Sequence, residues 1–549
     1  MQDSNCDTYY RYDVWGITKY DQLIQVQRKY GSMTSYRSTS YNYDQNYNRT
    51  SMVDGAGNGT SYAYDANNQL ASVTRLGTTS FTYDAVGNRT QKTFPNSAYT
   101  AYTYNDRNLL TSLENHDRYG ALVSSYAYAH DNVGNRTSMT EADGSVTSYA
   151  YDNVYRLADE TKRDSQDNVL YRYQYTYDGV GNRLTENNAG VITYSYDANN
   201  KLTQLVGPSG TTTFGYDDNG NTTSMVQPGP VTTTYGYDYE NRLTTVTNPS
   251  YTAAYTYAAD GLRLRVQESN AQYPDRWMQP LGPFGAGVAA QRVQPYDGVR
   301  PVLEGTLSGD TYTTTAKYVW EGNSYYDPLV FAYFAGAWKH FLYDGLGSTR
   351  QLLDASQTVA DSYAYEAFGN LMSSAGSTPN PYRYVGSLGY YQTGNELMHL
   401  GARYYAPELG RFTAPDPFGH LAAWPPPNKV SAGELGETTD YTYCGNDPVS
   451  TTDPEGLQAV PSTNMYYCLM GTLSNCKVIG ATPAKNRRFC EMVTMTYFNN
   501  CLNCKGGPQN CTPKKIPGYT FEETVTALGK QVKCRWRCKF DGKECECCY

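Results

Sequence analysis

The feature that most constrains this chain is a short phrase that recurs through its first half. The phrase consists of an aromatic residue, any residue, Tyr-Asp, two variable residues and Gly-Asn-Arg. Its fullest copies lie at residues 81–89 and 175–183, and a variant lies at 128–136. Repetition of this kind indicates an architecture in which each copy builds one supersecondary unit. Looser copies contain Tyr43, Tyr64, Tyr104, Tyr151, Tyr196, Tyr216, Tyr237 and Tyr257.

One repeat predicts a β-hairpin. Later Tyr-Asp pairs are roughly twenty residues apart, which is enough for two strands and two turns. Residues 191–196 are rich in β-branched and aromatic side chains, which fit the pleated surface of a strand. Asp197 predicts the next turn, because Asp tolerates left-handed backbone angles and binds its own main chain. In fuller copies Gly181 supplies the positive φ of a tight turn, and residues 201–203 begin the return strand.

The composition also favours strands and turns. Tyr occurs 57 times against 14 Phe and 6 Trp, and 49 Gly are present. A hydrophobic fraction of 39% is low, but disordered chains are poor in aromatic residues and this chain is not. Since 549 residues are too many for one ordinary core, the repeats must supply a continuous one. We therefore expect a mainly β fold whose antiparallel hairpins wind into a shell around a cavity or an internal plug.

Charge and cysteine content both divide the chain near residue 462. Residues 463–549 contain 13 Lys or Arg and 6 Asp or Glu, a net charge of +7, which leaves −9 − 7 = −16 for the first 462 residues. Eleven of the 13 cysteines also follow residue 462. A basic tail on an acidic body predicts either a solvated basic surface or a segment that binds nucleic acid or a membrane surface.

A second set of phrases lies between residues 341 and 457. They are Tyr-Asp-Gly-Leu-Gly-Ser-Thr-Arg at 343–350, Tyr-Ala-Tyr-Glu-Ala-Phe-Gly-Asn at 363–370, Pro-Tyr-Arg-Tyr-Val-Gly at 381–386, Ala-Arg-Tyr-Tyr-Ala-Pro-Glu-Leu-Gly-Arg-Phe at 402–412, Pro-Asp-Pro-Phe-Gly at 415–419, Tyr-Thr-Tyr-Cys-Gly-Asn-Asp-Pro at 441–448 and Asp-Pro-Glu-Gly-Leu at 453–457. With the repeats, these phrases make the chain resemble the Rhs/YD-repeat family of polymorphic-toxin type. The resemblance implies a YD-repeat β-shell over residues 1–340, an Rhs-associated core over 341–457 and a variable domain over 458–549.

In that family the shell encloses a C-terminal cargo, often a toxin, and the core cuts the chain after its final Asp-Pro-x-Gly-Leu. Carried over to this sequence, the resemblance implies cleavage between Leu457 and Gln458, with Asp416 and Asp453 as the catalytic carboxylates. Two close carboxyl groups suit this chemistry because they do not both ionise easily. One stays protonated and polarises a carbonyl group, while the other activates water.

Departures from the family pattern leave alternatives open. His420 stands in place of the usual Leu, Ala406 in place of the usual Asp, and a proline-rich insertion lengthens the spacing between Asp416 and Asp453. The Asp-Pro pairs could also form turns and nothing more. Asp440 and Asp447 are alternative candidates for the carboxylate that acts with Asp416.

The repeated phrases end at Leu457. A small cysteine-rich α+β domain is predicted after it. A helix is expected over residues 484–497, where Thr-Pro supplies the cap and the first turn. A second is expected over 520–529, where Thr and Glu have capping-box spacing and Gly supplies the end. Residues 533–543 alternate like a hairpin with an Asp-Gly turn.

The cysteines of this domain favour disulfide bonds, because so small a unit buries too little core to be stable alone. Zinc is the less favoured alternative: Cys501 and Cys504 have ligand spacing, but the others do not complete a regular site. A nucleophilic cysteine is disfavoured because the domain has no His as its base. We therefore expect no metal and no cofactor. The disulfide candidates are Cys468, Cys476, Cys490, Cys501, Cys504, Cys511, Cys534, Cys538, Cys545, Cys547 and Cys548.

Basic side chains and one Trp in the same domain have the chemistry to bind phosphate and stack on bases. These anionic-ligand candidates are Arg487, Arg488, Lys514, Lys515, Arg535, Trp536 and Arg537. The lack of His excludes His-based nucleases and the His-x-Glu zinc deaminases. A nuclease here would have to use Lys, Arg, Glu and Tyr, and no motif identifies the domain's activity.

Two functional hypotheses follow. The first is a secreted Rhs-type effector of interbacterial competition, which encloses its own C-terminal domain as cargo, releases it by self-cleavage, and has an immunity protein and a secretion machinery as partners. The second is a cell-surface structural or adhesive YD-repeat protein with a disulfide-stabilised cap. No signal peptide is predicted, because no apolar run follows a basic start. No membrane span is expected either, because the most apolar stretch, residues 328–341, is too short.

Overall fold

The computed structural model divides the chain into two compact units. Residues 1–424 and 436–462 form the first unit, and residues 425–435 and 463–549 form the second. The structure describes residues 6–12, 23–30, 37–270, 290–294, 296–297, 299–308, 311–322, 326–334, 336–417, 440–457, 460–461, 520–527, 530–538 and 545–547.

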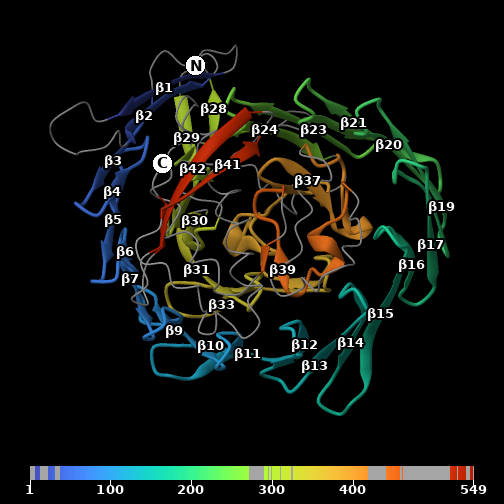
Figure 1. Cartoon of the computed structure of the whole chain (residues 1–549), viewed down its shortest axis with the longest axis horizontal. Helices are drawn as coiled ribbons and strands as arrows, with labels where there is room; N and C mark the ends of the chain where they lie inside the picture. Colours follow the sequence, from blue (N-terminus) through green and yellow to red (C-terminus); the bar gives the residue numbers. More distant parts are fainter. Residues whose placement is uncertain are drawn as a thin grey trace. The chain divides into compact units, whose positions relative to one another are not determined.

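The first unit is built on one antiparallel sheet whose 32 strands follow one another in chain order (Figure 1). Each strand pairs with the next along the chain as far as β25, which pairs with β28, and the order then continues to β34. Neighbours in space that are also neighbours in sequence make this sheet a long series of hairpins. The mainly β shell predicted from the repeats is therefore confirmed. The expected border between shell and core, at residues 340 and 341, lies inside strand β31. The sheet is therefore continuous across this border.

The strands of this sheet are β1 (Cys6–Tyr12), β2 (Leu23–Tyr30), β3 (Arg37–Tyr43), β4 (Arg49–Val53), β5 (Gly59–Tyr64), β6 (Leu70–Thr74), β7 (Thr78–Tyr83), β8 (Arg89–Thr93), β9 (Tyr99–Tyr104), β10 (Leu110–His116), β11 (Leu122–His130), β12 (Arg136–Glu141), β13 (Val146–Tyr151), β14 (Leu157–Arg163), β15 (Val169–Tyr177), β16 (Arg183–Asn187), β17 (Val191–Tyr196), β18 (Leu202–Gly207), β19 (Gly210–Tyr216), β20 (Thr222–Gln227), β21 (Val231–Tyr237), β22 (Leu243–Asn248), β23 (Tyr251–Tyr257), β24 (Arg263–Asn270), β25 (Ala290–Val293), β28 (Leu303–Ser308), β29 (Thr311–Trp320), β30 (Leu329–Phe334), β31 (Ala337–Tyr343), β32 (Thr349–Leu353), β33 (Val359–Tyr365) and β34 (Leu371–Ala375).

The Asp and Asn of the repeated phrase build its turn. The Asp84 carboxylate accepts hydrogen bonds from the Val86 amide at 3.0 Å, from the Asn88 amide at 2.8 Å and from the Asn88 side chain at 2.9 Å. Slight burial opposes ionisation, but these hydrogen bonds outweigh it and hold the pKa of Asp84 below its ordinary value. Asn88 also donates to Asn108 in the next turn at 3.0 Å, so successive turns are linked. Gly87 has φ +95°, as the sequence predicts.

The Tyr of the phrase ties most of these hairpins to the one before. The Tyr177 hydroxyl donates to the Leu157 carbonyl at 2.8 Å, one hairpin earlier. This backward hydrogen bond explains why Tyr is so much more frequent than Phe, which has the same ring without a donor. The same bond is made by Tyr43 to Leu23, Tyr64 to Arg49, Tyr83 to Leu70, Tyr104 to Arg89, Tyr151 to Arg136, Tyr196 to Arg183, Tyr216 to Leu202, Tyr257 to Leu243, Tyr343 to Leu329 and Tyr365 to Thr349.

Removing one of these hydroxyls is expected to weaken the shell measurably. Tyr177→Phe keeps the ring and deletes the bond to the Leu157 carbonyl. We expect the free energy of unfolding to fall by about 1 kcal/mol, seen as a lower thermal midpoint. Tyr239→Phe is the control, because Tyr239 is fully exposed. Equal midpoints for the two variants would show that the repeated hydroxyl has no structural role.

The Arg that ends the phrase points to the inner face and binds what lies there. Arg183 is 5% exposed, and its guanidinium stacks on the Phe368 ring, with the centroid 4.2 Å away. Arg136 donates to the Val449 carbonyl at 3.1 Å, and Arg49 forms a buried ion pair with Asp297. In several hairpins the repeat therefore places an Arg on the inner face of the sheet. There the Arg contacts segments that are far away in the sequence.

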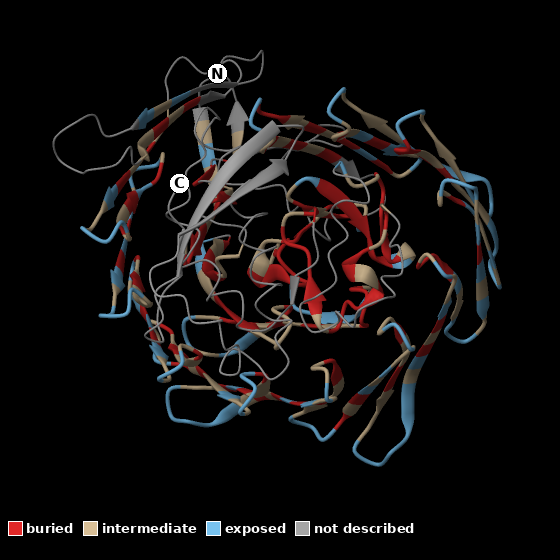
Figure 2. Ribbon diagram, in the orientation of Figure 1, coloured by how far each residue is buried: buried red, intermediate tan, exposed pale blue. Residues whose placement is uncertain are grey.

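Residues 380–417 and 440–457 form a plug inside this sheet, where buried residues concentrate (Figure 2). Hairpin turns hold it from several sides: the Asn446 side chain donates to the Gly181 carbonyl at 2.8 Å, and the Tyr441 hydroxyl donates to the Gly220 carbonyl at 2.7 Å. The short elements of this unit are β26 (Tyr296–Asp297), β27 (Arg300–Pro301), η1 (Gly386–Leu388), β35 (Tyr391–Gln392), β36 (Met398–Leu400), β37 (Arg403–Ala406), η2 (Pro407–Leu409), β38 (Arg411–Phe412), η4 (Cys444–Asn446), β39 (Thr451–Thr452) and β40 (Val460–Pro461).

A buried pair of carboxyl groups joins the hairpin of β14 and β15 to the turn after β33. Glu160 accepts a hydrogen bond from the Ala367 amide at 2.9 Å, and Glu366 accepts one from the Phe368 amide at 2.9 Å. Glu160 is 1% exposed and Glu366 is 2% exposed. Burial and the neighbouring carboxylate raise the pKa of Glu160, and burial raises that of Glu366.

In the second unit the described residues form one antiparallel sheet of β41 (Thr520–Ala527), β42 (Lys530–Cys538) and β43 (Cys545–Cys547). The helix predicted over residues 520–529 is therefore wrong. The β-branched and aromatic residues of Thr-Phe-Glu-Glu-Thr-Val-Thr favour a strand, and they outweigh the capping-box spacing. The strands on either side of the expected Asp-Gly turn pair as β42 and β43, and the turn itself lies outside the described residues. The helix predicted over 484–497 lies outside the described residues, and no helix among those described supports an α+β class for this domain.

Candidate functional site

Arg403 brings the two predicted catalytic carboxylates together. Its Nη2 lies 3.1 Å from an Asp416 oxygen and 3.6 Å from an Asp453 oxygen. Arg403 is 5% exposed and Asp453 is 2% exposed, so the cluster is shielded from bulk water. The cluster therefore holds two carboxylates beside one guanidinium.

Strand β37 and the ring of Phe412 fix the position of the guanidinium. Arg403 is the first residue of β37, and its guanidinium carbon lies 3.6 Å from the centroid of Phe412 on β38. Its Nη1 donates to the Asp440 carbonyl at 2.8 Å, and its Nε donates to the Gly456 carbonyl. Burial lowers the pKa of Arg403, and the charges of Asp416 and Asp453 partly offset this. The side chain is thus oriented by four segments of the plug.

The Asp-Pro-Glu-Gly-Leu turn is anchored at both ends. Asp453 Oδ1 accepts a hydrogen bond from the Leu457 amide at 3.0 Å, so the carboxylate lies beside the residue that precedes the predicted cleavage point. The Asp453 amide donates to the Tyr390 hydroxyl at 2.6 Å, and the Ala402 amide donates to the Glu455 carbonyl at 2.8 Å. Leu457 is 7% exposed. These hydrogen bonds fix the backbone of the turn in the interior of the plug.

The glycine of this turn is required by its surroundings. Gly456 has φ +65°, and a Cβ there would lie 2.0 Å from the Leu400 carbonyl oxygen and 3.0 Å from the Arg403 amide. Backbone atoms cannot move away as the end of a side chain can. This close approach explains why the phrase carries Gly between Glu455 and Leu457, a reason that the sequence alone does not reveal.

The two alternative carboxylates have other roles in the described geometry. Asp447 accepts a hydrogen bond from the Ser450 amide at 3.3 Å within its own turn. Asp440 contributes its backbone carbonyl, which accepts from Arg403 at 2.8 Å and from the Asp416 amide at 3.0 Å. The Arg403 guanidinium pairs with Asp416 and Asp453, and the charge of Asp440 also acts on it.

Cys444 and two tyrosines line the other side of Asp453. The Tyr390 and Tyr443 hydroxyls are 3.0 Å apart, and Cys444 is a free, buried thiol. Burial raises the pKa of Cys444 well above its ordinary value, and the charge of Asp453 adds to this. The thiol is therefore a neutral neighbour of the carboxylate pair rather than a nucleophile.

Sequence reasoning missed Arg403, Tyr390 and the role of Gly456. Arg403 stands in one of the family phrases, and the signal available was an Arg on a short, otherwise aromatic strand. Gln458 and every disulfide or anionic-ligand candidate lie outside the residues whose side chains the structure describes. Within the described part, no group of three His, Cys, Asp or Glu side chains is placed to hold a metal ion. No helix there has the length and apolar character needed to cross a bilayer.

Comparisons with known proteins match the repeat. The profile of the family described as RHS Repeat matches residues 64–99, 196–232 and 216–253. The chain is 32% identical over 148 residues to salivary gland surface protein 1 of Aedes aegypti, a match that covers 26% of this chain and 4% of that protein. It is 33% identical over 122 residues to the tRNA(Glu)-specific nuclease WapA of Bacillus subtilis subsp. natto strain BEST195, covering 22% of this chain and 5% of the nuclease.

Solved structures match the shell. The crystal structure of TcdB2-TccC3-Cdc42 superposes with a TM-score of 0.62 at 18% identity, covering 82% of this chain and 24% of that one. TcdB2-TccC3 without its hypervariable C-terminal region gives a TM-score of 0.58 at 18% identity, covering 83% of this chain and 24% of that one. The chain thus spans a quarter or less of the length of these relatives.

Fold and repeat together define a β-shell protein assembled from RHS repeats. The matched repeat and the matched shell are those that the motifs predict, so the resemblance to Rhs/YD-repeat proteins is confirmed.

Proposed function

We propose that this protein is a toxin-type Rhs shell that cuts its own chain after Leu457 and so frees residues 458–549 as cargo. The observation that carries the proposal is the convergence of Asp416 and Asp453 on the Arg403 guanidinium, with the Leu457 amide bound to Asp453. This geometry supports an aspartyl-type hydrolysis of the next peptide bond.

In the proposed reaction, one carboxylate takes a proton from water, and the resulting hydroxide adds to the Leu457 carbonyl carbon. The other carboxyl group, protonated, donates a hydrogen bond to the carbonyl oxygen and stabilises the tetrahedral intermediate. The bond to the Gln458 nitrogen then breaks, and that nitrogen takes a proton from the pair. The products are a carboxylate at Leu457 and a new amino group at Gln458. Arg403 keeps both carboxyl groups beside the bond.

The cargo is proposed to act on an anionic target such as nucleic acid in a competing bacterium. Its net charge of +7 and its candidate anion-binding side chains support this, as does its similarity to WapA, a tRNA nuclease. In this proposal the cysteines stay reduced in the producing cell and form bridges after export, which gives the freed domain a stable fold. An immunity protein, a secretion machinery and an extracellular or surface location belong to the same proposal.

A surface-protein function is the second candidate. Salivary gland surface protein 1 of Aedes aegypti matches 26% of the chain, and that relative is named as a surface protein. In that case the repeats mediate adhesion, and residues 458–549 serve as a disulfide-stabilised cap. The Asp-Pro pairs are then turns without a catalytic role.

The two functions predict different products and different toxicity. For the toxin-type shell, purified full-length protein is expected to give a fragment whose first residue is Gln458, detected by a denaturing gel and amino-terminal sequencing. Expression of residues 458–549 in a susceptible bacterium, in the cytoplasm or the periplasm, is expected to arrest growth. A chain that stays whole, together with a harmless C-terminal domain in both compartments, would reject this function in favour of the surface protein.

A further inference from the structure

Arg263 is a deeply buried cation without a carboxylate partner among the described residues. It begins β24 and is 1% exposed, yet its guanidinium forms no ion pair within the part of the chain that the structure describes. Its Nη1 donates to the Tyr404 hydroxyl at 3.0 Å, and the Tyr391 ring centroid lies 4.5 Å from its guanidinium carbon. Its Nε has no hydrogen-bond partner. Such a group is strongly destabilising unless a negative charge accompanies it.

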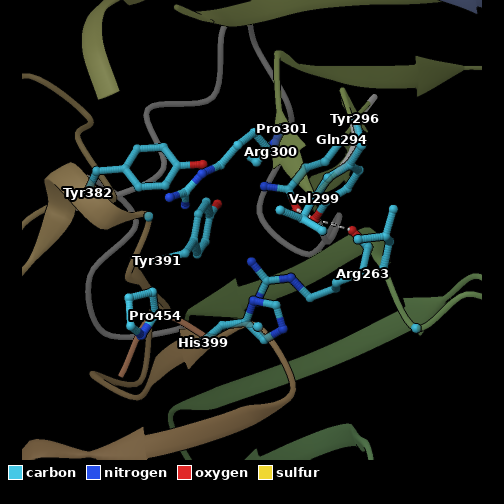
Figure 3. A pocket seen from close by; sticks show the side chains of 14 residues that line it. Arg263, Gln294, Tyr296, Val299, Arg300, Pro301, Tyr382, Tyr391, His399 and Pro454 are labelled. Carbon is cyan, nitrogen blue, oxygen red and sulfur yellow. Dashed lines mark hydrogen bonds between the residues drawn. The ribbon is translucent and has the colours of Figure 1, made fainter. Parts of the chain in front are cut away.

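A small pocket lies against this guanidinium (Figure 3). Arg263 and Arg300 both line it, and so does Tyr382, a fully buried side chain whose hydroxyl has no hydrogen-bond partner. The pocket thus brings together two cations and an unused hydroxyl donor. Its free volume of about 30 Å³ is enough for one or two water-sized particles. That volume fits a small monatomic ion.

The nearby carboxylates are occupied elsewhere. Glu304 accepts hydrogen bonds from Gln294 at 3.2 Å and from Tyr391 at 3.3 Å, and Asp297 is ion-paired with Arg49. The positive charge of Arg263 is therefore not neutralised by either of them. It is felt by His399, another lining residue: burial lowers the pKa of His399 well below its ordinary value, and Arg263 lowers it further.

We propose that this pocket binds a small monovalent anion of chloride size. The anion accepts hydrogen bonds from the Arg263 Nε and the Tyr382 hydroxyl, and it neutralises the buried guanidinium. Pro454 and Gly401 also line the pocket, so the anion lies beside the Asp-Pro-Glu-Gly-Leu turn and supports the packing of that turn against β24. The site depends on the fold of the plug and not on the cleavage reaction.

Bromide, which replaces chloride in such sites and scatters anomalously, is the direct probe. Crystals of the full chain grown or soaked in sodium bromide are expected to show an anomalous peak within hydrogen-bond distance of Arg263 Nε. Crystals of Arg263→Gln are expected to lack it. A bromide-soaked wild-type crystal with only water in the pocket would overturn the proposal.

A solution measurement tests the same site independently. With gluconate replacing chloride at constant ionic strength, the thermal midpoint of the full chain should rise by about 2 °C for each tenfold rise in chloride once the site is filling. Arg263→Gln should remove this response, whereas Arg242→Gln should keep it, because Arg242 is a partly exposed cation already paired with Asp238. Equal responses in all three proteins would overturn the proposal.

If Arg263→Gln does not fold, Tyr382→Phe takes its place. That variant keeps the ring and removes one donor, so about fivefold more chloride should be needed for the same midpoint shift. An unchanged chloride requirement would count against the site.

Discussion

Asp416→Asn is expected to leave the 549-residue chain whole under conditions in which the wild-type protein is cut after Leu457. The amide cannot take a proton from water, and it cannot share one with Asp453, so the rate of cleavage should fall by at least about a hundredfold. Because Asn has the shape of Asp, its contact with Arg403 can persist while the chemistry is lost. The measurement is the fraction of cut chain over time on a denaturing gel.

Two further variants identify the second carboxylate. Asp453→Asn should also leave the chain whole, because Asp453 shares the guanidinium and binds the Leu457 amide. Asp440→Asn should still be cut, since Asp440 holds Arg403 through its backbone carbonyl. The reverse pattern, with cleavage lost in Asp440→Asn and kept in Asp453→Asn, would show that the pair is wrongly assigned. Matching thermal midpoints would confirm that all three variants are folded.

The hairpins were predictable because their determinants are local. Asp84 and Asn88 are four residues apart and form their turn without help from the rest of the chain, so a short phrase was enough. The Tyr177 hydroxyl reaches one hairpin back, which explains the tyrosine content only once the register is known. The mistaken helix over residues 520–529 shows the limit of this approach, because capping-box spacing is compatible with a strand as well.

The candidate site was only partly predictable. Asp416 and Asp453 were found through a resemblance to a family, and the physical reason for their approach, the Arg403 guanidinium, was missed. Arg403 is oriented by contacts from Asp440 and Gly456, whose proximity depends on how the plug folds inside the shell. No local pattern encodes such contacts. Arg263 escaped notice for the same reason, since a buried cation looks like any surface Arg in the sequence.

The stability of the protein is expected to depend on pH through the buried pair Glu160 and Glu366. Tyr171 donates to Glu160 at 3.0 Å and Tyr175 donates to Glu366 at 3.3 Å, and the backbone amides of Ala367 and Phe368 face the same two carboxyl groups. The charged residues that also act on the pair are Glu186, Arg183 and Lys162. Burial raises the pKa of both carboxyl groups; the charge of Glu366 adds to this at Glu160 and that of Glu186 adds to it at Glu366, so the hydrogen bonds are outweighed.

The sign of the pH effect follows from this shift. Below the ordinary pKa of a carboxyl group, both carboxyl groups are protonated in the folded and in the unfolded chain. In that pH range the pair makes its full contribution to the free energy of unfolding. As the pH rises past the ordinary range of a carboxyl group, the unfolded chain loses its protons first, so stability falls until the raised pKa values are passed. The slope can approach ~1.4 kcal/mol per pH unit for each proton involved.

Glu160→Gln isolates this effect, because Gln is neutral at every pH and relieves the repulsion of Glu366. Between about pH 5 and about pH 8, the thermal midpoint of the wild-type protein should fall relative to that of Glu160→Gln. Other groups that titrate in this range, such as Lys92 with a pKa lowered to about 7 by burial, are present in both proteins and cancel in the difference. Glu240→Gln, an exposed carboxyl on a hairpin turn, should follow the wild type. If the thermal midpoints of Glu160→Gln and the wild type change in parallel with pH, the protonation of the buried pair is not coupled to folding. Any pH dependence of stability would then come from other groups.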